Sequence, residues 1–121
     1  MEVGVVIAKQ LEEVCITYPI IADKGAEYPF AVYRRTALGE NLTKDLRTDG
    51  YIEYATVELV IASTKYSDSI RLAQEAKTKL EATKGNIDGV KINDIRMISA
   101  TENWGNDAYM QIMTYRIEIE K

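Results

Sequence analysis

The chain has 121 residues, of which 46% are hydrophobic and 28% are charged, as in one globular domain rather than a disordered chain or two domains. Its 15 Lys and Arg residues against 19 Asp and Glu residues give a net charge of −4. A nucleic-acid partner is therefore not expected, because such binding depends largely on an excess of basic side chains.

The first predicted element is an amphipathic helix over residues 2–14, where apolar residues recur at close to helical spacing. The helix is expected to stop before Pro19, since Tyr18, the residue before a proline, is pushed out of the α region. Residues 16–22 favour an extended segment or a short strand, and residues 23–27 have the composition of a turn.

Two strands with a long connection are predicted next. Pro29 leads into a strand over residues 30–35, and residues 51–63 alternate apolar and polar side chains. The apolar face of the second strand carries Ala55, Val57, Leu59 and Ile61. Residues 39–50 between the two strands are polar and form a connection longer than an ordinary hairpin loop. The two strands should pair as an antiparallel hairpin.

A second helix of about 17 residues is expected to start near Ser67, a residue suited to an N-cap, with Asp68 in its first turn. Gly85 is predicted to end this helix. The apolar face carries Ile70, Ala73, Ala76 and Leu80, with Thr83 beyond them.

Two final strands are predicted over residues 90–101 and 108–120. The residues between them form a turn, in which Gly105 and Asn106 both tolerate a positive φ. The last strand alternates apolar and polar residues cleanly, which is typical of a sheet covered on one side only.

These elements predict a single α+β domain over residues 1–121, with the order α-β-β-α-β-β. The expected architecture is a four-stranded, mainly antiparallel sheet with two helices packed on one face, because this arrangement buries both apolar helix stripes. The chain shows no internal repeat and no Pro- or Gly-rich linker.

The sequence offers little for catalysis. It contains no histidine, which removes the commonest general base and the commonest metal ligand. Cys15 is interpreted as a core thiol, and carboxylates such as Glu118 and Glu120 are more typical of a solvated strand face than of an acid and base pair. No catalytic residue, cofactor site or metal site is predicted, and the protein is not expected to be an enzyme.

Cysteine content and hydropathy bear on location. A single cysteine cannot form an internal disulfide and favours a reducing compartment. No apolar run approaches the ~18 residues that a membrane span requires, and the N-terminal apolar run is too short for a secretory signal. A cytoplasmic protein without a membrane partner is expected.

Three apolar side chains lie outside the predicted core. Trp104 is either folded back onto the core or offered to a partner, since tryptophan is enriched at interface anchors. Leu42 and Leu46 lie in the long polar connection without an evident local core, which favours contact with a partner.

Three segments together resemble the tail-completion, or tail-terminator, proteins of long-tailed bacteriophages and prophages. They are Ile20-Ile21-Ala22-Asp23 with Tyr28-Pro29-Phe30-Ala31-Val32-Tyr33-Arg34, Val57–Ala62 running into Tyr66–Ala73, and the turn Asn103–Tyr109. The resemblance extends from about residue 3 to 119, and the charged segment 39–50 departs from it.

The resemblance implies a non-enzymatic structural protein, found in the host bacterial cytoplasm during assembly and then in the virion tail. Copies would form a ring, typically hexameric, that ends the tail tube and helps to join tail and head. Its partners would be further copies of itself, the tail tube protein and the head-tail connector proteins. The residues expected at these contacts are Leu42, Leu46, Arg47, Trp104 and Asn106.

Two other classes remain open from the residues alone. A small α+β ligand-binding or regulatory module would show a defined pocket between helix and sheet. An enzyme that uses carboxylates or tyrosines would need carboxylates converging in a cleft.

Overall fold

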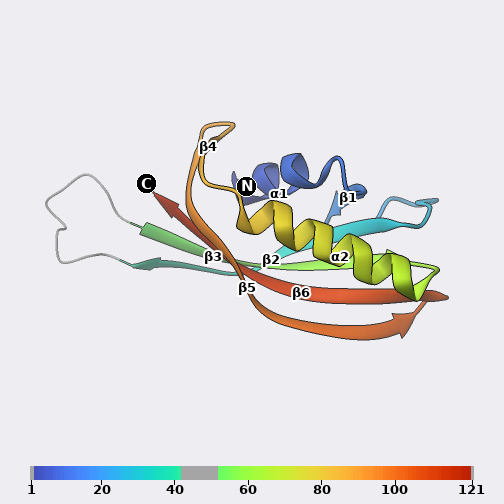
Figure 1. Ribbon diagram of the computed structural model, residues 1–121. Coiled ribbons are helices and arrows are strands. Elements are labelled where there is room, and N and C mark those ends of the chain that lie inside the picture. Colours follow the sequence, from blue (N-terminus) through green and yellow to red (C-terminus); the bar gives the residue numbers. More distant parts are fainter. Residues whose placement is uncertain (1, 42–51, 121) are drawn as a thin grey trace, which may run out of the picture.

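The computed structural model describes residues 2–41 and 52–120 (Figure 1). Its elements, in chain order, are α1 Glu2–Leu11, β1 Ile16–Pro19, β2 Phe30–Asn41, β3 Ile52–Ser63, α2 Tyr66–Glu81, β4 Gly85–Ile87, β5 Val90–Gly105 and β6 Ala108–Glu120. Figure 1 shows both helices on one face of a curved sheet, with β5 bending strongly along its length.

The sheet has six strands in the order β1-β2-β3-β6-β5-β4, and β1 pairs with β2 in parallel while the other pairs are antiparallel. The predicted four-stranded sheet was therefore wrong: the sheet is mixed, curled like half a barrel, and larger by two edge strands. Both extra strands, β1 and β4, have at most four residues, too few for a period-two pattern. They are strands because a neighbouring strand offers them hydrogen bonds.

The core lies between the two helices and the sheet. Helix α1 contributes four buried residues, namely Val3, Val6, Ile7 and Leu11. The alternation predicted for β3 is confirmed, since Ala55, Val57, Leu59 and Ile61 are all buried. The alternation predicted for the last strand is also confirmed, since the apolar residues Met113, Tyr115, Ile117 and Ile119 of β6 are buried. Burial of these side chains is the main favourable contribution to folding.

Helix α1 ends at Leu11, three residues before the predicted end. The backbone N–H groups of Val14 and Cys15 both donate to the carbonyl oxygen of Leu11, at 2.9 and 3.2 Å, so the chain turns there. Val14 still packs against the core from this turn, which explains why it continued the helical pattern.

Helix α2 begins at Tyr66, and its N-cap is Lys65, which makes no side-chain capping bond, so the predicted N-cap Ser67 lies inside the helix. The buried face consists of Ser69, Leu72, Ala76 and Leu80, so Ala76 and Leu80 are confirmed, while the first half of the face is shifted from the predicted Ile70 and Ala73. The shift is possible because the Ser69 hydroxyl is hydrogen-bonded: it donates to the Tyr66 carbonyl at 2.7 Å and accepts from Gln111 Nε2 at 3.2 Å.

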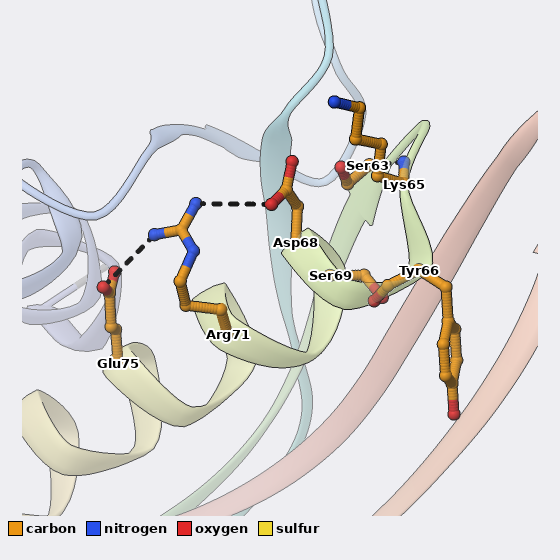
Figure 2. A network of polar contacts seen from close by, with 7 residues as sticks. All are labelled: Ser63, Lys65, Tyr66, Asp68, Ser69, Arg71 and Glu75. Carbon is orange, nitrogen blue, oxygen red and sulfur yellow. Dashed lines mark hydrogen bonds and ion pairs between the residues drawn. The ribbon is translucent and has the colours of Figure 1, made fainter.

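The outer face of α2 carries the polar network drawn in Figure 2. Arg71 lies between Asp68 at 3.7 Å and Glu75 at 3.3 Å. Pairs three and four residues apart stabilise a helix modestly. The helix ends at Glu81, and Gly85 begins β4 with a φ of 91°, so the glycine does not end the helix as predicted.

The β5–β6 hairpin is tighter than predicted. Its strands run to Gly105 and Ala108, so the turn consists of Asn106 and Asp107, with φ values of 52° and 60°. Positive φ at both central residues is typical of the type I′ turns that suit the twist of a hairpin. Asn106 therefore adopts the expected conformation, and Asp107 takes the place predicted for Gly105.

Strands β2 and β3 form the predicted antiparallel hairpin, paired from Phe30 with Ala62 to Asn41 with Ile52. Strand β2 thus continues into the segment predicted as a loop. Strand β1 covers only the Phe30–Tyr33 part of β2. Among the described residues, the outer edge of β2 beyond Tyr33 has no strand partner.

Candidate functional site

The groups considered for chemistry are separated in space. The described residues contain no group of three or more His, Cys, Asp or Glu side chains able to hold a metal ion. Cys15 is half-buried against the core, and burial, followed by the negative charge of Glu75, raises the pKa of its thiol to about 11. The reactive thiolate is therefore disfavoured at neutral pH.

Several carboxylates are engaged in ion pairs at different places on the surface. Asp88 accepts from Lys9 Nζ at 2.9 Å, and Glu120 lies 3.0 Å from Lys91 Nζ. Glu118 lies opposite Asp94 in the register of β6 with the neighbouring strand β5.

In the described part of the chain, no helix is long and apolar enough to cross a membrane.

At the hairpin tip formed by β5 and β6, Trp104 and Tyr109 form an exposed aromatic cluster with Tyr66, the first residue of α2. Trp104 packs edge-on against Tyr109 at 4.7 Å, and Tyr109 packs edge-on against Tyr66 at 5.4 Å. Tyr66, whose ring points away from the polar network in Figure 2, donates a hydrogen bond to Glu102 Oε1 at 3.0 Å. The cluster holds the tryptophan in place while 54% of it stays exposed.

The turn below the tryptophan is also fixed. The Tyr28 hydroxyl donates to the carbonyl oxygen of Asn106 at 2.9 Å, which connects the segment before β2 to the tip of the opposite hairpin. Trp104 and Asn106, predicted at an interface, thus lie together on one exposed tip. Trp104 packs on the ring of Tyr109, outside the hydrophobic core, and is open to solvent, so its contact with a partner stays a prediction. Leu42, Leu46 and Arg47 lie outside the described residues.

A second surface feature is a groove of about 730 Å³ between α1 and the edge formed by β1 and β2. Its lining consists of Gly4, Val5, Ala8, Pro19, Ile20, Tyr33, Arg34 and Arg35. The lining is mostly apolar, and the two guanidinium groups are its charged members. Burial of apolar surface there would drive binding of an apolar partner group.

Ile20 at the groove has an unusual backbone. Its φ is 66°, in the left-handed region that β-branched residues avoid, and 74% of the residue is exposed. Its N–H donates to the carbonyl oxygen of Tyr33 at 2.7 Å, which holds this conformation. Such a conformation costs on the order of 1–3 kcal/mol and is commonest at functional positions. The side chain is left open beside the groove.

The sequence interpretation missed this groove. Ile20 and Ile21 are adjacent exposed isoleucines that lie after β1 and outside any regular element. The two adjacent isoleucines were visible in the sequence as a signal for an exposed apolar surface. The rest of the groove was not visible, because α1 and β2 meet only through the tertiary fold.

The comparisons with known proteins show a likeness in fold. No family model matches the chain, and no curated protein matches it in sequence. Among solved structures, it is similar to a chain of the "Virion of native gene transfer agent (GTA) particle" at 9% sequence identity and a TM-score of 0.71. The match covers 96% of this chain and 85% of that one, so the two chains share a fold over nearly their whole lengths.

Proposed function

We propose that this chain is a structural protein of a phage or phage-like particle, in which copies form a ring that ends the tail tube and helps to join tail to head. The observation that carries the proposal is the fold shared with a virion chain over 96% of this chain. The sequence resemblance to tail-completion proteins, in element order and short motifs, supports the same class.

The surface also favours assembly over chemistry. Its exposed apolar residues include Ile16, Ile20, Ile21 and Trp104, a pattern that marks interaction surfaces when such residues gather. Within residues 2–41 and 52–120, the outer edge of β2 beyond Tyr33 has no strand partner, and natural proteins seldom leave such an edge uncovered without a reason. A closed ring needs two different patches on each copy, and the groove and the hairpin tip are two such patches.

The proposed partners are further copies of this chain, the tail tube protein and the head-tail connector proteins. The predicted contact residues Trp104 and Asn106 lie on the exposed tip, where they are available to any of these partners. Assembly would take place in the host bacterial cytoplasm, and the finished ring would remain in the virion tail.

The sequence of the DNA on either side of the gene tests this proposal. Genes for head-closure proteins on one side, and for a tail tube or tape-measure protein on the other, are the expected result. Metabolic or regulatory genes on both sides would overturn it. This test is independent of how the purified protein behaves in solution.

The groove also favours a second candidate function, a small ligand-binding module. Its volume of about 730 Å³ lies within the range of about 300–1,000 Å³ typical of small-molecule sites. Arg34 and Arg35 could fix the orientation of an acidic ligand with an apolar body. Screening apolar carboxylic acids by thermal shift would test this, with the Arg35→Ala variant as the control: binding that requires Arg35 would support the module.

A further inference from the structure

The groove and the hairpin tip are complementary in chemistry. The groove has an apolar wall that includes Val5 and Ile20, with arginines at its polar side. Arg34 Nε is bonded to Glu58 Oε1 at 3.1 Å, whereas Arg35 is exposed and forms no ion pair with another described residue. Arg35 is therefore free to pair with a carboxylate on an incoming partner.

The tip presents the matching groups. Trp104 offers a large apolar ring. Asp107, in the turn, is an exposed carboxylate that forms no ion pair in the described part of the chain. Tyr109 packs against the Trp104 ring, and the bond from Tyr28 to the Asn106 carbonyl holds the backbone of the turn that carries Asp107. Little conformational entropy is lost when such a preorganised surface binds.

The two surfaces belong to different parts of one molecule. The groove lies at the β1–β2 edge, while the tip belongs to β5 and β6, with β3 between them in the strand order. A contact between groove and tip therefore joins two copies through different patches. Such a heterologous contact repeats from copy to copy, and it gives a ring when the rotation closes.

We propose that the groove between α1 and the β1–β2 edge receives the β5–β6 hairpin tip of a second copy of this chain. Trp104 of the incoming copy packs on the apolar wall near Val5 and Ile20, and Asp107 pairs with Arg35. The exposed, left-handed Ile20 is thereby covered. This inference rests on the proposed ring, and it identifies the contact that builds the ring.

A charge exchange at the proposed pair tests the contact in the full chain. The variants are Arg35→Glu, Asp107→Lys and the two combined, and Lys84→Glu is the matched control. Lys84 is exposed, forms no ion pair with the other described residues, and is part of neither surface, since it lies between α2 and β4. Sedimentation velocity and native mass spectrometry report the assembly state, and far-ultraviolet circular dichroism shows that each variant is folded.

The wild-type chain and Lys84→Glu should assemble with equal affinity. Each single exchange at the pair should weaken assembly at least about tenfold, because it places like charges together, and the double exchange should recover most of the loss. Assembly that is unaffected by Arg35→Glu, or loss that the double exchange does not recover, would overturn the contact and leave the proposed ring standing.

Two further outcomes would also reject the inference. A wild-type chain that stays monomeric up to about 1 mM has no self-contact of useful strength. A monomer whose groove binds an apolar fluorescent dye, with Arg35→Glu reducing that binding, would assign the groove to a small ligand. The sequence of the flanking DNA then decides separately whether the proposed role in a tail survives.

Discussion

Gly4 of α1 faces the phenol of Tyr33 in β2 so closely that a Cβ atom on the glycine would lie 2.9 Å from Tyr33 Oη. Glycine in a helix interior costs about 1 kcal/mol relative to alanine. Here the missing side chain lets α1 approach the strand at the floor of the groove. The glycine in α1 therefore helps to determine the shape of the groove that we propose for assembly.

Replacing Gly4 with alanine should change the free energy of unfolding by less than about 1 kcal/mol. The higher helix propensity of alanine stabilises α1, and the displacement of the Tyr33 ring by the new Cβ atom offsets this gain. In a Tyr33→Phe background, which lacks the nearest oxygen, the same replacement should be more stabilising. Urea unfolding of the four proteins measures both effects. An identical effect of Gly4→Ala in the two backgrounds would contradict the proposed clash.

Truncation of Trp104 should separate assembly from folding. Trp104→Ala should lower the affinity between copies at least about tenfold, because aromatic anchors dominate many interfaces, while the monomer stays folded. Ile98→Ala is a matched control, since Ile98 lies on the same strand and is equally exposed, at 54%. Sedimentation velocity compares the two variants. Equal affinities for both, or normal joining of particles by Trp104→Ala, would remove the tryptophan from the interface.

The sequence predicted those parts of the fold in which apolar and polar residues alternate over many positions. Strands β3 and β6 alternate over 12 and 13 residues, so their buried faces were predicted correctly. Strand β1 lies within the segment 16–22 that was predicted as extended, but β1 and β4 are too short to show a period of two, and their pairing depends on where neighbouring strands lie. The number of strands was therefore the part that the sequence could not supply.

The buried face of α2 was predicted correctly at Ala76 and Leu80, and its first half was predicted wrongly for a different reason. A serine is seldom assigned to a core, yet Ser69 is fully buried because two hydrogen bonds satisfy its hydroxyl. Among the residues of the candidate interface, Trp104 and Asn106 could be identified from the sequence, because they lie at a predicted hairpin turn. Arg35 could not, because only the packing of α1 beside β2 turns that arginine into one side of a groove.

The Ser69 hydroxyl should contribute measurably to stability. Ser69→Ala removes the hydrogen bond from Gln111 and the one to Tyr66, and we expect a loss of about 0.5–1.5 kcal/mol in the free energy of unfolding. Gln111→Ala should cost less, because the Ser69 hydroxyl still donates to the Tyr66 carbonyl in that variant. A double-mutant cycle by urea unfolding measures the coupling. Strictly additive losses would show that the Ser69–Gln111 bond contributes nothing.

Asp107 offers a variant that should improve folding and impair assembly. Its φ of 60° lies in the region where glycine is favoured, and Asn-Gly is a preferred type I′ turn. Asp107→Gly should therefore leave the melting temperature unchanged or raise it, as calorimetry can measure. The same change removes the carboxylate proposed to pair with Arg35, so assembly should weaken. Stronger assembly of this variant would contradict the proposed role of the charge.

The thiol of Cys15 should make stability fall at alkaline pH. Burial, and then the charge of Glu75, raises its pKa from 9.0 to about 11, so the folded state holds the proton more tightly than the unfolded chain does. The resulting stabilisation is complete below pH 9 and is lost as the pH rises from 9 to 11.

Alkylation of the folded protein by iodoacetamide gives a direct measurement of this pKa. The rate should rise with a midpoint near pH 11, and in the Glu75→Gln variant the midpoint should move down, because the second cause of the shift is removed. Tyrosines also ionise in this range, so Cys15→Ala is the control for stability: its free energy of unfolding should fall less steeply between pH 9 and 11. A midpoint near pH 9 in the folded wild-type protein would mean that the thiol is solvated rather than packed against the core.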